Sequence, residues 1–263
     1  MDLQLGKKTA LVTGSTAGIG NAIATSLARE GASVIINGRT PTTVDAVVAA
    51  MKSATGGNVV GFAGDLSVAS VAEELARKHP KVDILVNNLG IFEVRPFEQI
   101  SDADWQRFFD VNVLSGARLS RLYLPGMRKR NWGRIIFISS ESGLQIPAEM
   151  VHYGMTKAAQ IAVARGLAES TAGTGITVNS VLPGPTRSRG VGDFVADWAL
   201  KSGKSAKTVE DEFFKTARPT SLLKRFATPE EVAALVTFVA SPLSAATNGA
   251  ALRVDGGVVR SAF

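Results

Sequence analysis

The sequence predicts an α/β fold: a doubly wound parallel sheet of about seven strands with helices on both faces. Two patterns predict it. Short, continuously apolar runs alternate with longer stretches of helical periodicity, and glycine or polar residues directly follow the apolar runs. Continuous apolar runs indicate strands buried on both faces, which is typical of parallel sheets. The length of 263 residues fits one domain covering residues 1–263.

The expected elements follow in order from the N-terminus. We expect strands at residues 9–13, 33–37, 58–63, 82–87, 133–140, 177–181 and 250–254. We expect helices at residues 18–30, 44–52, 71–78, 102–130, 151–172 and 230–240. Thr228 and Pro229 predict where the last helix starts, because a threonine hydroxyl can cap a helix N-terminus and proline is favoured in the first turn. Residues 187–227 break the alternation, and a segment of this length in a compact domain is usually functional.

The composition excludes several classes of site. The chain has no cysteine, which excludes disulfides, thiolate zinc sites and iron–sulfur clusters, and its two histidines do not favour a metal site. The net charge is +6, and its densest cluster (Arg128, Lys129, Arg130) ends an expected helix, where cations suit the helix dipole. We therefore expect no nucleic-acid partner. No apolar run approaches the ~18–20 residues that span a bilayer, so we expect no membrane partner and a cytoplasmic location.

A glycine-rich turn follows the first expected strand and reads TGSTAGIG at residues 13–20. Glycines allow a tight turn, and the N-terminal amides of the helix that follows can bind an anion such as a pyrophosphate. The predicted contacts of this turn are Gly14, Ser15, Thr16, Gly18, Ile19 and Gly20.

At this point the chain resembles the short-chain dehydrogenase/reductase family over essentially its whole length. The turn matches the family pattern T-G-x-x-x-G-x-G, and residues 87–90 read NNLG where the family usually has N-N-A-G. The resemblance implies a Rossmann-like fold and a nicotinamide cofactor. It also implies cofactor contacts from Asn88 and Gly90, and from Asp65 and Leu66 beside the adenine. Leu89 departs from the pattern and changes the packing beside the cofactor.

The same resemblance implies a catalytic tetrad. Tyr153 and Lys157 are four residues apart, which places them on one helix face, and an ammonium near a phenol favours the phenolate. Ser140 precedes Tyr153 by thirteen residues, as in the family, and Asn112 matches the family's asparagine. The implied roles are proton transfer by Tyr153 and a hydrogen bond to the substrate oxygen from Ser140. Lys157, helped by the cationic nicotinamide, would lower the Tyr153 pKa and would also hold the nicotinamide ribose. Tyr153 and Lys157 are therefore expected cofactor contacts as well. Asn112 would position a water molecule that relays protons.

Cofactor choice depends on the end of the second strand. By alignment to the family, Gly38 stands where an NAD-type acidic residue would be, and Arg39 follows it. A guanidinium suits a 2′-phosphate, so NADP(H) is favoured over NAD(H). The alternatives for Arg39 are a solvated loop residue, or one that stacks on the adenine of NAD. After the sixth strand, the resemblance implies cofactor contacts from Pro183, Gly184, Thr186 and Ser188.

These features predict an NADP(H)-dependent oxidoreductase that acts on a small-molecule carbonyl or secondary alcohol. A 3-oxoacyl-thioester reductase is one specific form, and a non-catalytic NADP-binding regulator is the alternative of another class. Glu141 and Glu149 are possible substrate contacts, and His152 is expected at the rim or in a structural role. The resemblance implies that residues 187–227 form a substrate-binding lid. This lid is basic and carries the aromatic residues Phe194, Trp198, Phe213 and Phe214, which suggests a substrate with an apolar body and an anionic group; an amphipathic helical lid explains it equally well. The family resemblance also implies a homo-oligomer, a tetramer or else a dimer.

Overall fold

The computed structural model describes residues 1–262. Phe263 lies outside the described residues, as do the side chains at 189, 190, 193, 194 and 197, so the predicted aromatic contribution of Phe194 to the lid is not described.

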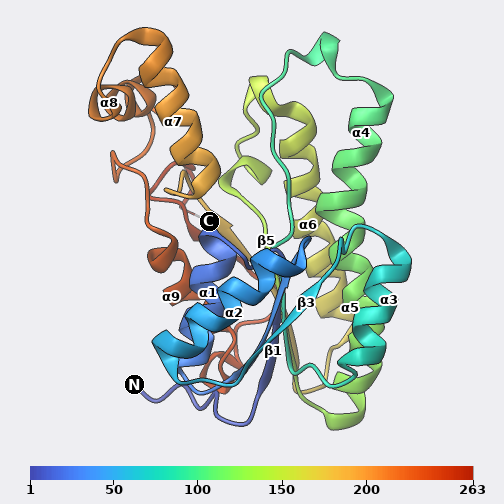
Figure 1. The fold of residues 1–263 in the computed structure, drawn as a ribbon. Coiled ribbons are helices and arrows are strands. Elements are labelled where there is room, and N and C mark those ends of the chain that lie inside the picture. The colour runs from blue at the N-terminus through green and yellow to red at the C-terminus, as the bar shows by residue number, and fades with distance from the viewer. Residues whose placement is uncertain (263) are drawn as a thin grey trace.

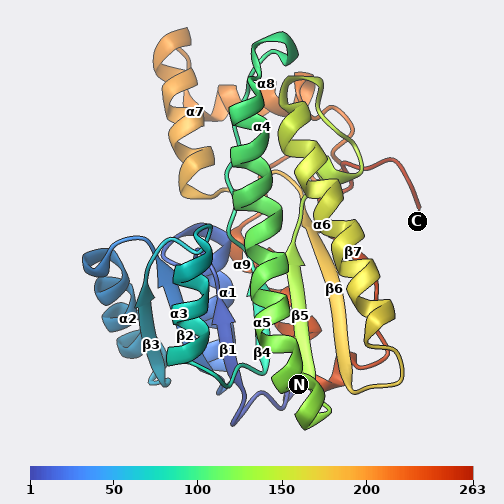
Figure 2. The same cartoon turned by 90° about the vertical axis from the view of Figure 1, so that its right-hand side faces the viewer.

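The centre of the protein is a parallel sheet, as the sequence predicts. Its strands are β1 Thr9–Val12, β2 Ser33–Gly38, β3 Val59–Ala63, β4 Ile84–Asn87, β5 Gly133–Ile138, β6 Ile176–Pro183 and β7 Ala251–Val254. They form a seven-stranded sheet in the order β3-β2-β1-β4-β5-β6-β7, with every neighbouring pair parallel (Figure 2). The winding direction reverses between β1 and β4, and ligands of such sheets bind at this point, beyond the carboxyl ends of the strands.

Helices connect the strands. They are α1 Gly18–Arg29, α2 Pro41–Thr55, α3 Ala69–Lys78, α4 Asp102–Phe109, α5 Ser115–Arg130, α6 Val151–Ser170, α7 Arg189–Ser202, α8 Ala206–Thr216 and α9 Pro229–Val239. Short 3₁₀ turns lie at Phe97–Gln99, Glu141–Gly143, Ala148–Met150 and Pro242–Ser244. The cap predicted for α9 is confirmed: the Thr228 hydroxyl accepts from the Glu231 amide, and the Glu231 side chain bonds back to the Thr228 amide.

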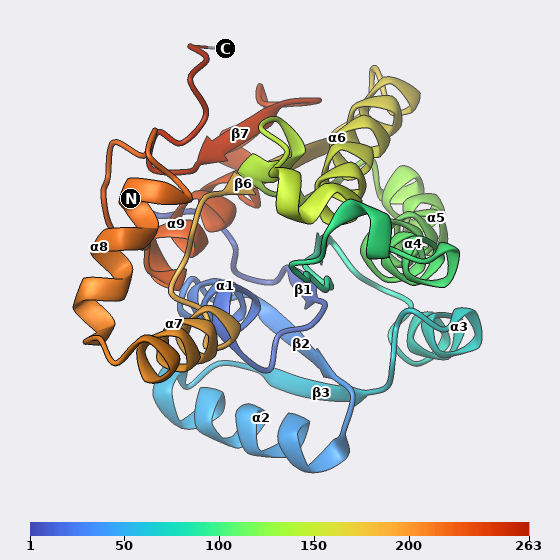
Figure 3. The same ribbon diagram turned by 90° about the horizontal axis from the view of Figure 1, so that it is seen from above.

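The helices cover both faces of the sheet (Figure 3). On one face α1, α2 and α9 pack against alternate strand residues such as Val12 and Ile36. On the other face α3, α5 and α6 pack against the intervening residues, such as Leu11 and Ile35. The strands are therefore apolar at consecutive positions because each face needs every second side chain.

Two regions differ from simple expectation. The helix expected at residues 102–130 is interrupted by a π-helical turn, Asp110–Leu114, which separates α4 from α5. The lid region forms the helices α7 and α8, which stand above the carboxyl ends of the strands (Figure 1). They enclose a small apolar cluster of their own, formed by Val195, Val209, Phe214 and Phe226. Within the described residues, no helix combines the length and apolar character that crossing a bilayer requires.

Candidate active site

A cavity of about 490 Å³ lies at the carboxyl ends of the strands. It is bordered by the loops after β4, β5 and β6, by the start of α6 and by the lid. Ten predicted site residues line it: Ile19, Asn88, Gly90, Ser140, Tyr153, Lys157, Pro183, Gly184, Thr186 and Ser188. The possible substrate contacts Glu141 and Glu149 line it as well. The other predicted cofactor and catalytic residues lie outside its lining, in the glycine turn, at the ends of β2 and β3, and in the π-helical turn.

The glycine turn leads into the exposed N-terminus of α1. Gly14 and Gly18 have φ angles of +59° and +55°, which favour glycine. A Cβ at Gly20 would lie 2.5 Å from Nδ2 of Asn88, so only glycine allows this close approach. The N-cap residue Ala17 supplies no side-chain cap, and the first turn of α1 has no acidic residue. The first amides of α1 are therefore available to an anion.

Ser15 holds this turn to the end of β2. Its hydroxyl donates to the Val12 carbonyl at 2.7 Å and accepts from the Asn37 amide at 2.9 Å. The Asn37 side chain in turn accepts from the Gly14 amide at 3.1 Å. Ser15 is fully buried, so its side chain organises the turn instead of facing the cavity. Sequence reasoning missed Asn37, although its place at the end of a buried strand was a signal.

Arg39 and Gly38 lie just beyond, at the end of β2. Arg39 is exposed, and no described residue forms a hydrogen bond or an ion pair with its guanidinium. Gly38 is buried, and a Cβ there would lie 2.4 Å from Cγ2 of Thr16 and 3.1 Å from Cγ2 of Val44. The Thr16 side chain therefore occupies the space into which a side chain at position 38 would grow.

The residues predicted after β3 and β4 take different positions. The Asp65 carboxylate accepts from the Ser67 amide and hydroxyl at 2.9 and 2.7 Å, and Leu66 is buried beside it. The Asn88 amide group donates to the carbonyls of Thr13 and Gly14 at 2.9 and 3.1 Å. Asn88 thus ties the end of β4 to the glycine turn.

Ser140 and Tyr153 face each other from the end of β5 and the first turn of α6. Burial and the negative charge of Glu141 raise the pKa of Tyr153 above its ordinary value. The neighbouring Ser140 side chain and the positive charge of Arg218 lower the pKa, but by less. The phenol is therefore protonated at neutral pH in the protein alone.

In the protein alone Lys157 does not reverse this shift, whereas the sequence-based expectation combined Lys157 with the cationic nicotinamide. Its Nζ lies 5.5 Å from the centre of the Tyr153 ring and donates to the carbonyl of Ile138 at 3.0 Å and to Oε1 of Gln160 at 3.1 Å. Burial lowers the pKa of Lys157 to about 8. The physical reason is that burial penalises both charged forms, the phenolate and the ammonium.

Asn112 is fully buried in the π-helical turn, and its side-chain amide is completely engaged. It accepts from the Ile91 amide at 2.8 Å and donates to the Ile91 carbonyl and the Thr156 hydroxyl. The Asn112 carbonyl accepts from Nε2 of Gln160 at 2.6 Å. Gln160 thus links Lys157 to Asn112 directly. Sequence reasoning missed Gln160, although its position three residues after Lys157 places both on one helix face.

The two hydroxyls predicted in the loop after β6, those of Thr186 and Ser188, differ in their hydrogen bonding. The Thr186 hydroxyl donates to the Gly184 carbonyl at 2.9 Å. The Ser188 hydroxyl has no hydrogen-bond partner among the described residues, and its Cβ is close to Gly18 of the glycine turn. Ser188 is therefore the hydroxyl that remains available to a ligand.

Glu141 forms a buried ion pair with the lid. Its carboxylate accepts from the Ser140 hydroxyl and from the amide and hydroxyl of Ser142, and it pairs with Nε of Arg218 at 2.9 Å. The Glu141 and Arg218 side chains are 5% and 13% exposed. A second carboxylate, that of Glu149, lies 3.6 Å from Arg218 and is 48% exposed. Sequence reasoning noted both glutamates but not the arginine.

His152 plays a structural part. It is fully buried, with its ring centre 4.1 Å from that of Phe108 and 6.1 Å from that of Trp105. Burial lowers its pKa, which favours the neutral ring, and it does not line the cavity. The rim position considered for His152 is therefore wrong and the structural role is confirmed.

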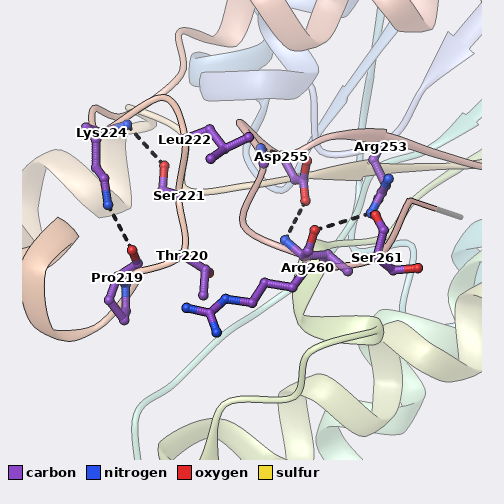
Figure 4. Close-up of a pocket in the computed structure, with 11 residues that line it drawn as sticks. Pro219, Thr220, Ser221, Leu222, Lys224, Arg253, Asp255, Arg260 and Ser261 are labelled. Atoms are coloured by element: carbon purple, nitrogen blue, oxygen red, sulfur yellow. Dashed lines mark hydrogen bonds between the residues drawn. The ribbon is translucent and has the colours of Figure 1, made fainter.

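A second cavity, of about 600 Å³, lies between residues 219–224 and the C-terminal residues (Figure 4). It shares no lining residue with the first. Two of its three described cations bind backbone carbonyls: Lys224 donates to Pro219, and Arg253 donates to Ser261. It contains none of the predicted site residues, so the chemistry belongs to the first cavity.

Comparison with known proteins now gives the family. Residues 8–198 match the family model described as short chain dehydrogenase. The chain belongs to the short-chain dehydrogenase family. It is therefore an oxidoreductase of a family that binds a nicotinamide cofactor, and the exposed α1 N-terminus and the glycine-only approach at Gly20 fit such a group.

Several members of the short-chain dehydrogenase family are similar over their whole length. The uncharacterized oxidoreductase YvaG of Bacillus subtilis is 49% identical over 100% of both chains. D-beta-hydroxybutyrate dehydrogenase of Cupriavidus necator is 36% identical over 97% of this chain and 99% of its own. The structure of L-sorbose reductase from Gluconobacter frateurii with NADPH and L-sorbose aligns with a TM-score of 0.93 at 30% identity, over 99% of this chain and 100% of that one.

Proposed function

We propose that this short-chain dehydrogenase transfers a hydride between NADP(H) and a carbonyl or secondary alcohol. The observation that carries the proposal is the convergence of Ser140, Tyr153 and Lys157 on one cavity. That cavity borders the glycine turn at the N-terminus of α1 through Ile19. A non-catalytic NADP-binding regulator is disfavoured, because it needs no such arrangement of proton donor, hydrogen-bond donor and lysine.

The residues that would hold the cofactor lie in three places. The α1 N-terminus would bind the pyrophosphate, Asn88 and Gly90 border the central part, and Ser188 offers a hydroxyl to the nicotinamide end. The bound cofactor supplies the hydride. Preference for NADP(H) rests on Arg39, an unpartnered guanidinium, and on the absence of a side chain at Gly38. The NADPH-bound L-sorbose reductase supports the same choice.

The chain's own residues supply the proton chemistry. Tyr153, protonated at neutral pH, donates its proton to the substrate oxygen during reduction and accepts it back during oxidation. Ser140 orients that oxygen and stabilises the developing negative charge. Lys157, Gln160 and the Asn112 carbonyl form a continuous hydrogen-bonded chain behind Tyr153. This chain holds the Lys157 ammonium in place beside the phenol.

Two finer features complete the proposal. A 3-oxoacyl-thioester reductase remains the specific form to test first, because the cluster Arg128–Arg130 could dock an acidic carrier protein. We also propose a cytoplasmic homotetramer with two-fold axes, for which α5 and α6 offer helical surfaces. Light scattering should give a mass well above 27.6 kDa at micromolar concentration, and a stable monomer would contradict this part.

The test is a substrate panel of ketones, 3-oxoacyl thioesters, sugars and steroids, with NADPH consumption as the readout. At least one carbonyl class should be reduced by the wild-type enzyme, and Tyr153→Phe should lose that activity while still binding NADPH. Failure of NADPH binding, or binding without turnover of any carbonyl, would reject the proposal and favour the regulator.

A further inference from the structure

Four charged residues stand among the described residues that line the cavity: Glu141, Glu149, Lys157 and Arg218. Their arrangement decides whether a charged substrate can bind. A carboxylate substrate would need one of the two cations to be available. Neither is.

The Lys157 ammonium forms its hydrogen bonds inside the protein. It donates to the Ile138 carbonyl and to Gln160, and the residue is 5% exposed. Burial lowers its pKa to about 8. Its position beneath Tyr153 assigns it to the proton chemistry.

Arg218 is committed to Glu141. Its Nε donates to the Glu141 carboxylate at 2.9 Å, and its Nη1 donates to the Ala217 carbonyl at 2.9 Å and lies 3.6 Å from Glu149. One guanidinium therefore faces two carboxylates, and the buried pair cannot open without leaving Glu141 as an unpaired buried charge. The local balance at this end of the cavity is negative.

None of the other described lid cations lines the cavity. Lys204 and Lys207 pair with Glu212 and Asp211 of α8, Arg187 pairs with Glu210, and Arg225 pairs with Glu231. Several of the positive charges of the lid are thus neutralised away from the cavity. The remaining wall is mostly apolar, and its described members include Ile91, Phe92, Val94, Trp198, Phe213 and Phe226.

We propose that the cavity selects an uncharged carbonyl compound with apolar substituents and rejects carboxylates, with Glu141 and Glu149 as the residues that set this choice. This inference rests on the proposed function. It replaces the anionic substrate that lid composition alone suggests. It also separates this chain from its relative D-beta-hydroxybutyrate dehydrogenase, whose named substrate carries a carboxylate. Repulsion between like charges in a partly buried site, together with the cost of desolvating the substrate carboxylate, provides the physical basis.

The test compares two substrates of nearly identical shape, 3-oxobutanoate and 3-oxobutanamide, which differ in charge. We expect kcat/KM with NADPH to favour the amide by at least about tenfold, a difference of about 1.4 kcal/mol in transition-state binding. Glu149→Gln should raise the ratio of acid to amide several-fold, because it removes a negative charge without touching Ser140. Lys204→Gln, which removes an exposed lid cation, is the matched control and should leave the ratio unchanged. Glu141→Gln should shift the ratio in the same direction as Glu149→Gln, even if it slows both reactions.

Equal or better turnover of the acid by the wild-type enzyme would overturn the proposal, and so would an unchanged ratio in Glu149→Gln. If neither compound is reduced although other carbonyls are, butanoate and butanamide are compared as inhibitors of the best substrate. The amide should then inhibit at least about tenfold more strongly, and equal or stronger inhibition by butanoate would overturn the proposal. Loss of all carbonyl reduction would instead reject the proposed function.

Discussion

Replacing Arg39 by alanine tests cofactor choice with little disturbance of the fold. Arg39 is exposed at the end of β2, and among the described residues nothing hydrogen-bonds or pairs with its guanidinium. Its loss should therefore change the free energy of unfolding by no more than about 0.5 kcal/mol. Any large effect on nucleotide affinity then reports a direct contact with the nucleotide.

The expected magnitude follows from the charge on the phosphate. A hydrogen bond to a charged group contributes roughly 1.5–3 kcal/mol. Since about 1.4 kcal/mol corresponds to a tenfold change, Arg39→Ala should weaken NADPH binding by roughly 10- to 150-fold. NADH has no 2′-phosphate, so its affinity should change by about twofold or less.

The assay is a calorimetric or fluorescence titration of both nucleotides into the wild-type protein and the variant, at one salt concentration. Thermal unfolding of the two proteins provides the control for stability. Equal losses for NADPH and NADH would mean that Arg39 only stacks on the adenine. A wild-type protein that binds NADH more tightly than NADPH would refute the reasoning for NADP(H) altogether.

Three other substitutions give separate tests. Tyr153→Phe should abolish turnover and leave NADPH affinity within a few fold; a variant that keeps more than about a tenth of the wild-type rate would contradict the assigned acid/base role. Gly38→Asp alone should weaken NADH as well as NADPH, because its Cβ would lie 2.4 Å from Cγ2 of Thr16, and adding Thr16→Ser should restore NADH binding. Tighter NADH binding by the single variant, in the same titrations, would show that Thr16 moves aside freely. Thr228→Ala should lower the free energy of unfolding by about 1 kcal/mol in urea melts, because it removes the cap of α9, and an unchanged midpoint would count against that role.

The sheet was predictable from the sequence because its signal is local. Consecutive apolar residues such as those of β2 have no polar face, and each strand is followed by a turn. The family resemblance supplied the prediction that Ser140, Tyr153 and Lys157 act together, and they line one cavity because β5 and α6 are adjacent in sequence. Local patterns thus account for the fold, and the family resemblance for the centre of the site.

The remaining parts of the site depend on contacts that no local pattern encodes. Glu141 and Arg218 are 77 residues apart, and only the packing of the lid over β5 brings them together. The direction of the Tyr153 pKa shift was also not predictable, because it depends on burial and on Glu141 as well as on the distance to Lys157. The π-helical turn within the helix expected at residues 102–130 was not predicted, because one wider turn hardly changes the spacing of apolar residues along a helix.

That π-helical turn gives the active site an unusual dependence on chain length. In Asp110–Leu114 the amide of Ser115 bonds to the Asp110 carbonyl five residues back, so the turn holds one residue more than an α-helical turn. The wider turn absorbs this extra residue, so deleting one codon there would restore a regular helix and leave α4 and α5 close to their present relative orientation. Asn112 would remain in the sequence but turn away from Gln160 and Ile91. A single-residue deletion, which leaves every catalytic side chain present, would dismantle the site as effectively as a substitution within it.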